Sequence, residues 1–306
     1  MQRFKTLLLR EWMQHQRGWW VLMALPFLLV VAAGLFGQVQ IDLNDPGSVD
    51  LPPPVAVVLA VWVGLGAVTL LLAWLASMLQ SPGLARRDAQ DRSIEFWLSL
   101  PIGHAQGLGA TLLMHLLLWP WLALLVGLAG GALASLLIVS KAFGVVAWFA
   151  LPWATLVPAL LMLTLRVMLG FLLATLWLSP LILGTMAASA WLKRWGVPLV
   201  VAGTGVAGLV LDKVYANPVV WQTLHFLSES ASRALLVADR GGADTSKALV
   251  IEHAADITGV LANAPGWLLH DAASALAMLT TPAFVATAAA GAAAFGLLWL
   301  RLARGA

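Results

Sequence analysis

The sequence predicts an all-α, polytopic membrane protein, and three observations support this prediction. Apolar residues make up 61% of the 306 residues, charged residues make up 10%, and the mean hydropathy is +0.91. Because a soluble domain carries about 25% charged residues, a water-soluble globule of this size is excluded. Uncharged apolar runs long enough for a spanning helix recur along the chain, without any strand-rich stretch or internal repeat. Cysteine is absent, which excludes a disulfide framework, a thiolate metal site and a cysteine nucleophile.

Residues 1–17 predict an amphipathic interfacial helix on the inner membrane surface. Four apolar side chains fall on one helical face: Phe4, Leu7, Leu8 and Trp12. Basic residues surround that face, as in helices that lie on a membrane. An ordinary basic flank of the next segment is the alternative. Residues 19–37 form the first predicted span, and the lack of a small-residue cleavage site distinguishes this run from a signal peptide.

The second and third predicted spans are residues 55–79 and 107–139. The third run has 33 residues, and as one helix it would measure roughly 50 Å. A hydrocarbon core is only ~30 Å thick. We therefore expect this helix to be tilted or broken, at Pro120 or at Gly130-Gly131.

The remaining apolar runs are residues 143–165, 167–192, 197–211 and 282–300. The run over 143–165 is the poorest span, because it contains Pro152 and Pro158 and lies between Lys141 and Arg166. We interpret it as an interfacial or re-entrant helix on the outer side. The chain is then a single domain with six crossings.

The charge distribution sets the orientation. With the N-terminus in the cytoplasm, eleven basic and four acidic residues lie inside, whereas six basic and ten acidic residues lie outside. Net charges of +7 inside and −4 outside follow, as the positive-inside rule requires. Both termini are therefore predicted to be cytoplasmic.

Residues 213–281 are the only sizeable polar segment, and we predict a small helical extracytoplasmic region there. Asn217 followed by Pro218 predicts a helix start, with Asn as the cap and Pro at the first helical position. Pro265-Gly266 predicts a helix break.

Motifs for enzyme chemistry are absent from the sequence. It has no P-loop, so ATP cannot bind in that way. A G-x-G-x-x-G match at residues 203–208 lies within a predicted span, where small residues allow close helix packing. Gly127 and Gly131 form a GxxxG pair, which predicts either the same close packing or a dimer contact. His115 and Arg166 lie in apolar runs and are candidate pathway or interface residues. A packed helix-interface histidine and a snorkelling arginine are the favoured alternatives.

The inner loop at residues 88–104 is the most informative segment. Asp91-Arg92-Ser93 predicts a helix start, and Pro101 predicts its end. The adjacent Phe96 and Trp97 would be exposed on the cytoplasmic side. Either the bilayer or a groove on a partner protein could cover this apolar pair.

The pattern Asp-Arg-Ser-x-x-Phe-Trp-x-Ser-Leu-Pro-Ile at residues 91–102 closely resembles a motif of bacterial ABC exporter permeases of the type-2 class. Arg10-Glu11-Trp12 with Gly18-Trp19-Trp20 resembles the start of that family's first span. Leu176-Trp177-Leu178-Ser179-Pro180, followed by Ser189-Ala190-Trp191 and Lys193-Arg194, resembles its fourth span and the inner turn behind it. Glu95 replaces the family's usual apolar residue, and Gly103-His104 replaces a small-plus-acidic pair.

The resemblance implies a permease homodimer in the bacterial cytoplasmic (inner) membrane, bound to two copies of a separate ABC ATP-binding subunit. ATP and magnesium would be bound by that subunit, and this chain would have no cofactor, metal or catalytic residue and no nucleic-acid partner. The loop between spans two and three would dock on the ATP-binding subunit as a coupling helix. Its docking residues would be Asp91, Arg92, Ser93, Glu95, Phe96, Trp97, Leu100 and Pro101.

Other functions remain open on the sequence. A membrane anchor or mechanotransmission subunit that transports nothing would usually carry a larger folded outer domain. A membrane-embedded enzyme would need a catalytic constellation within its spans. The apolar spans favour an amphipathic, lipid-like or hydrophobic peptide substrate over a hydrated ion, which would need polar rings. The outward direction of transport is implied by the resemblance alone.

Overall fold

The computed structural model describes residues 2–37, 53–84, 103–235 and 256–304, and every regular element within these ranges is helical. The elements are α1 (Gln2–Phe36), α2 (Pro53–Leu84), α5 (His104–Leu113), η1 (Met114–Leu118), α6 (Trp119–Phe143), α7 (Val145–Phe149), α8 (Trp153–Trp177), α9 (Ser179–Leu192), η2 (Lys193–Trp195), α10 (Gly196–Tyr215), α11 (Val219–Leu235), α13 (Asp256–Ala277), η3 (Met278–Thr280) and α14 (Pro282–Ala303). Six helical segments are long and apolar enough to cross a membrane. The predicted all-α class is confirmed for the described residues, and the six candidate spans agree with a multi-pass membrane protein.

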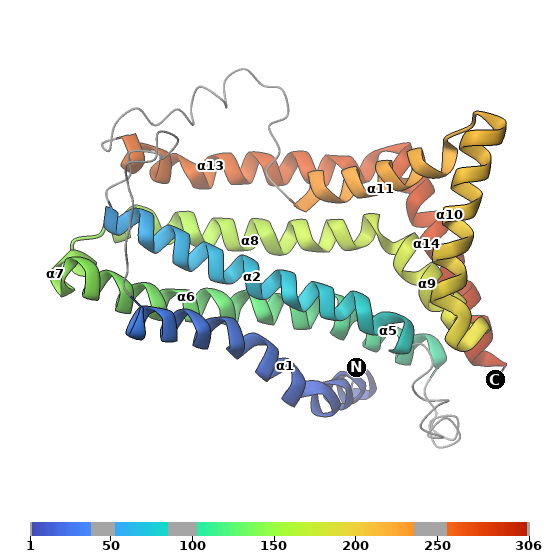
Figure 1. The fold of residues 1–306 in the computed structure, drawn as a ribbon, viewed down its shortest axis with the longest axis horizontal. Helices are drawn as coiled ribbons and strands as arrows, with labels where there is room; N and C mark the ends of the chain where they lie inside the picture. Colours follow the sequence, from blue (N-terminus) through green and yellow to red (C-terminus); the bar gives the residue numbers. More distant parts are fainter. Residues whose placement is uncertain (1, 38–52, 85–102, 236–255, 305–306) are drawn as a thin grey trace.

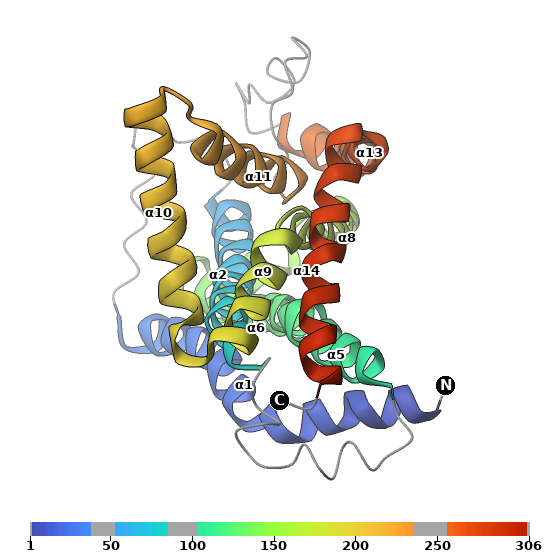
Figure 2. The same cartoon turned by 90° about the vertical axis from the view of Figure 1, so that its right-hand side faces the viewer.

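The helices form two groups that run across one another. In Figure 1, α1, α2, α6 and α8 follow the long axis of the molecule, and α11 and α13 run along α8. Helices α9, α10 and α14 stand across them at one end, and Figure 2 shows α10 and α14 upright from the side. Both views place the N-terminus, the C-terminus and the turn between α9 and α10 toward the same side of the molecule.

Helix α1 combines the predicted interfacial helix and the first span in one element. Its ribbon bends, so that the N-terminal part is seen nearly end-on in Figure 1 and lies across the bottom of the molecule in Figure 2. At the other end, Lys141 of α6 donates hydrogen bonds from Nζ to the carbonyl oxygens of Gly34, Leu35 and Gly37 at 2.8, 3.1 and 3.1 Å. A cation there satisfies carbonyls that have no partner within the helix and complements the helix dipole.

The long third run is interrupted directly before Pro120. Residues Met114–Leu118 form a π-helix, and Pro120 lies at the start of α6. Proline cannot donate its backbone nitrogen to the preceding turn, and an inserted π turn accommodates that loss. The expected break near Pro120 is thus only an irregular π turn within a helix that continues from Ala105 to Phe143, and Gly130-Gly131 lies within regular α6.

Gly127, Gly130 and Gly131 instead allow α6 to approach its neighbours closely. A Cβ atom on Gly131 would lie 2.7 Å from the Cα of Trp62 in α2, and one on Gly130 would lie 3.0 Å from the ring of Phe27 in α1. The GxxxG pair thus packs α6 on α2 within this chain, as small residues do between membrane helices.

Gly131→Ala is expected to destabilise the protein by about 1–3 kcal/mol, because the new methyl group would overlap backbone atoms that cannot rotate away. Gly64→Ala in α2 is the matched control, since no atom lies within 4 Å of its added Cβ. This control should gain up to about 1 kcal/mol of helix propensity. Thermal unfolding in detergent measures both variants, and equal unfolding midpoints would contradict the packing argument.

The prediction of one helix over residues 167–192 is wrong. The predicted boundary between the runs 143–165 and 167–192 is wrong as well. Helix α8 runs unbroken from Trp153 to Trp177, starts after Pro152, and contains Pro158. It is a candidate span in place of the interfacial segment over 143–165. Pro180 lies in the first turn of α9 and cannot donate to the preceding turn, which explains why a new helix starts there.

Helices α9 and α10 fold back on each other through η2. Lys193 at this turn has a positive φ of 54°, and a Cβ on Gly196 would lie 2.5 Å from the Cα of Ser189 in α9. Helix α14 packs along α9, where Trp191 Nε1 donates to the Leu297 carbonyl at 3.2 Å. The basic ends of α9 and α14 therefore lie together.

The polar region before the last helix packs along α8. Asn217 Oδ1 accepts the backbone N–H of Val219 at 3.2 Å, which confirms the predicted cap of α11. The predicted break at Pro265 is wrong, because α13 runs through it from Asp256 to Ala277. Neighbouring Leu261 is buried in a cluster with residues of α2, α6 and α8, and this packing compensates for the lost backbone hydrogen bond.

Candidate functional site

The structure places two of the predicted site residues, His115 and Arg166. The eight predicted docking residues, Asp91, Arg92, Ser93, Glu95, Phe96, Trp97, Leu100 and Pro101, lie outside the described residues. Both His115 and Arg166 are buried, with 0% and 2% of their surface exposed. Each contacts a carboxylate that is distant in sequence, and these two contacts are the most polar features of the described interior.

Glu11 is the centre of the first contact. It lies in the N-terminal part of α1 and is fully buried. Its Oε1 atom accepts a hydrogen bond from the Thr111 hydroxyl of α5 at 3.1 Å and contacts Arg10 Nη2 at 2.5 Å. A buried carboxylate is costly unless it is paired and hydrogen-bonded. These two donors therefore fix the orientation of the Glu11 side chain.

The second oxygen of Glu11 faces two imidazole rings. Oε2 lies 3.4 Å from Nε2 of His115 and 4.0 Å from Nδ1 of His15. His15 follows Glu11 by four residues, so both side chains project from one face of α1. The two histidine rings meet edge to face, with centroids 4.7 Å apart. We refer to Glu11, His15 and His115 as the Glu–His cluster.

The π-helix positions His115 beneath α1. The backbone carbonyl of His115 accepts a 2.6 Å hydrogen bond from the Ser77 hydroxyl of α2, which gives a partner to a carbonyl of the irregular turn. Neither ring nitrogen of His115 has a hydrogen-bond partner among the described residues. Because π turns are frequent at functional sites, this placement makes the cluster a candidate site.

Three stacked tryptophans cover one side of the cluster. Trp119, four residues after His115 and 0% exposed, stacks between Trp12 and Trp19 of α1. The centroid distances are 4.5 and 5.2 Å, and the rings are within 10° of parallel. Aromatic pairs of this kind contribute about 0.5–1.5 kcal/mol beyond the area that they bury. The stack therefore holds the N-terminal part of α1 against the start of α6.

Arg166 makes the second buried contact. Its Nε donates to Asp271 Oδ2 of α13 at 2.6 Å, and Nη2 lies 2.5 Å from the same oxygen. Nη1 donates to the Ala234 carbonyl of α11 at 3.0 Å. A Cβ on Gly170, one turn along α8, would lie 2.6 Å from Nη1. Arg166 therefore links α8, α11 and α13, rather than snorkelling to an interface.

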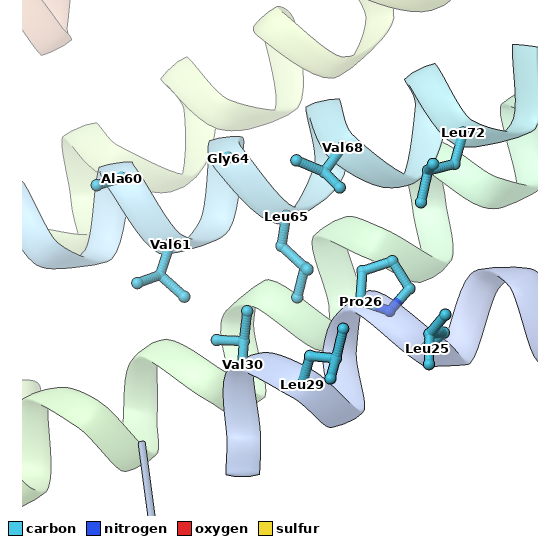
Figure 3. A pocket seen from close by; sticks show the side chains of 10 residues that line it. All are labelled: Leu25, Pro26, Leu29, Val30, Ala60, Val61, Gly64, Leu65, Val68 and Leu72. Atoms are coloured by element: carbon cyan, nitrogen blue, oxygen red, sulfur yellow. The ribbon is translucent and has the colours of Figure 1, made fainter. Parts of the chain in front are cut away.

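An apolar groove lies between α1 and α2, with a volume of about 490 Å³. Figure 3 shows ten side chains along it, all without polar groups. They are Leu25, Pro26, Leu29, Val30, Ala60, Val61, Gly64, Leu65, Val68 and Leu72. Its lining suits an acyl chain or an apolar side chain, and it lies farther along α1 than the Glu–His cluster.

Comparisons of the chain with protein-family models, with curated proteins and with solved structures find no match. The properties of the site are therefore inferred from the residues of this chain alone.

The sequence analysis missed both carboxylates. Glu11 was assigned to a basic surface helix, and Asp271 to the outer polar region, so neither was paired with His115 or Arg166. The i, i+4 spacing of Glu11 and His15 was a usable local signal. Glu11 is separated from His115, and Arg166 from Asp271, by about one hundred residues in sequence. No local pattern predicts contacts between residues so far apart.

Proposed function

We propose that this chain is the membrane-spanning permease subunit of an ATP-driven exporter of the type-2 ABC class, working with a separate ATP-binding subunit. The observation that carries the proposal is the pattern at residues 91–102, which resembles the loop that contacts the ATPase in that class. It falls between the second and third of the six apolar helical segments. Because the sequence has no P-loop, ATP and magnesium would be bound by the partner.

The Glu–His cluster supports a route for force from the loop into the membrane helices. Helix α5 begins at His104, shortly after the loop, and Thr111 of α5 donates to Glu11 of α1. The Trp12–Trp119–Trp19 stack joins the N-terminal part of α1 to the start of α6, which follows α5 through η1. Closure of the ATP-binding partner against the loop would therefore move α5 and the N-terminal part of α1 together.

The distribution of basic residues supports cytoplasmic termini in the inner membrane. Lys5 and Arg17 in α1, Arg194 at the α9–α10 turn and Arg304 near the C-terminus are all exposed. Figures 1 and 2 place these segments on one side of the molecule. That side would face the cytoplasm by the positive-inside rule.

The apolar surfaces support a lipid-like cargo and a paired permease. The groove between α1 and α2 has the size of a ligand site and an entirely apolar lining. Helix α10 exposes apolar side chains such as Val201 and Val206, and nothing lies within 4 Å of a Cβ added at Gly203 or Gly205. This face suits lipid or a second copy of the chain, in a complex of two permeases and two ATP-binding subunits.

The test is affinity purification from the native membrane in mild detergent, followed by mass spectrometry. We expect a stoichiometric P-loop protein to co-elute. Replacing Phe96 and Trp97 together with alanine should weaken this association by tenfold or more, because anchor residues of an interface each contribute about 2 kcal/mol or more. Membrane insertion should be unchanged.

Trp195→Ala is the matched control, because Trp195 is also aromatic and 59% exposed but lies at the α9–α10 turn. It should retain the partner. Unchanged co-purification of the Phe96/Trp97 double variant, or a native preparation without any P-loop protein, would contradict the proposal. ATPase activity stimulated by an apolar cargo would distinguish a transporter from a non-transporting anchor.

A further inference from the structure

We propose that the Glu–His cluster binds a divalent transition-metal cation, with Zn²⁺ as the best fit. Imidazole nitrogen and carboxylate oxygen are ordinary zinc ligands, and two histidines with one glutamate form a familiar three-ligand set. The ligand atoms of Glu11, His15 and His115 all lie within 4.8 Å of one another. This site goes beyond the proposed permease function, which requires no metal in this chain.

One separation of the ligand atoms fits a zinc ion, and the other is longer than a bound ion requires. Tetrahedral ligands lie roughly 3.3–3.6 Å apart when the metal–ligand bonds are about 2.0–2.2 Å. Oε2 of Glu11 is 3.4 Å from Nε2 of His115 and 4.0 Å from Nδ1 of His15. Nδ1 of His15 also lies 3.2 Å from the backbone carbonyl oxygen of Glu11, so metal binding requires the His15 ring to turn away from this carbonyl with Nδ1 unprotonated.

The remaining contacts of Glu11 act as an outer shell. Thr111 and Arg10 both contact Oε1, and Oε2 faces the histidines. Outer contacts of this kind orient a metal-binding carboxylate. Glu11 and His15 lie one turn apart on α1, so a continuous helix holds two of the three ligands in register.

His115 supplies an independent observation. It is 0% exposed, and neither of its ring nitrogens has a hydrogen-bond partner in the described parts of the chain. A buried polar group without a partner costs about 1–3 kcal/mol. A cation bonded to Nε2 would satisfy one of the two nitrogens. The π turn that carries His115 is also a backbone irregularity typical of functional sites.

The cluster is accessible from one side. The side chain of His15 is 23% exposed, whereas those of Glu11 and His115 are fully buried. A cation can therefore enter past His15, and a water molecule can take the fourth position of a tetrahedral site. A bound ion would join α1 to the π-helix and so restrain the N-terminal part of α1.

The experiment measures zinc binding to the purified full chain, prepared with a histidine-free tag and stripped with a chelator. Competition with a chromophoric chelator gives stoichiometry and affinity, and Co²⁺ absorption reports tetrahedral geometry. We expect one zinc ion per chain. His15→Gln and His115→Gln should each weaken binding by at least about tenfold, since even outer-shell changes cost 10–100-fold.

His225→Gln is the matched control. His225 forms an i, i+4 pair with Glu229 at 3.8 Å, but its side chain is 79% exposed and no third ligand lies near it among the described residues. Binding should be unchanged in this variant. If His115→Gln fails to fold, His15→Gln decides, because His15 lies at the edge of the site. No zinc binding, equal binding in His15→Gln, or an equal loss in His225→Gln would overturn the proposal.

Discussion

Arg166→Met is expected to destabilise the protein by about 3–5 kcal/mol, because it leaves the Asp271 carboxylate without its cation in a buried position. The side chains of Arg166 and Asp271 are only 1% and 12% exposed, so water is a poor replacement for the lost partner. The Ala234 carbonyl in the last described turn of α11 also loses its donor. Methionine retains the apolar stem and so isolates the loss of charge from a loss of volume.

The double variant Arg166→Met, Asp271→Leu distinguishes a broken ion pair from a general packing defect. Removing both charges should recover most of the loss, since apolar replacements of a buried pair are often neutral or stabilising. Thermal unfolding followed by tryptophan fluorescence measures the three proteins at one scan rate in one detergent. A double variant as unstable as Arg166→Met would contradict the ion-pair explanation.

Arg233→Met provides the surface control for that experiment. Arg233 pairs with Glu229 four residues earlier on α11, but both side chains are more than 40% exposed. Exposed pairs contribute about 0.2–1 kcal/mol, so this variant should unfold almost as the unmodified chain does. The contrast between the two arginines separates the effect of burial from the effect of the ion pair itself.

Composition and periodicity predicted the helical membrane class, because the apolar character and the length of each helix depend on residues that are close together in sequence. A helix cap such as Asn217 is set by the residues on either side and is confirmed, and the irregular turn before Pro120 has a similarly local cause. The limits of α8 and the path of α13 through Pro265 depend on packing between distant segments. Pro158 and Pro265 lie within continuous helices, because neighbouring helices compensate for the lost backbone bond in an apolar interior.

The candidate site was predictable in part. Polar residues such as His115 and Arg166 stand out in apolar runs because burying them is costly, which indicates that each has a partner. The identity of the partner depends on the tertiary fold. Glu11 and Asp271 were both assigned to solvated segments, and only the folding of α1 onto η1 and of α13 onto α8 reveals the two pairs.

Glu11→Ala is expected to release the N-terminal part of α1 without unfolding the rest of the chain. Hydrogen bonds to a charged group contribute about 1.5–3 kcal/mol, and the variant removes the charge beside His115 and the acceptor that links Thr111 to α1, leaving Thr111 only the Gly107 carbonyl within its own helix. Local opening should therefore increase by about 10–150-fold, because each 1.4 kcal/mol is a factor of ten. The chain has no cysteine, so Leu7→Cys introduces a single reporter thiol at a position where the native side chain is 4% exposed.

The rate at which this introduced thiol reacts with a maleimide reagent measures the opening directly. Glu229→Ala in the same background is the matched control, because Glu229 also contacts an arginine and a histidine but lies at an exposed position on α11. It should leave the labelling rate unchanged. Faster labelling in the Glu11 variant alone shows that buried polar contacts hold α1 in place. An unchanged rate in that variant would mean that the tryptophan stack alone holds the helix, and the Glu–His cluster would then carry no force between α5 and α1.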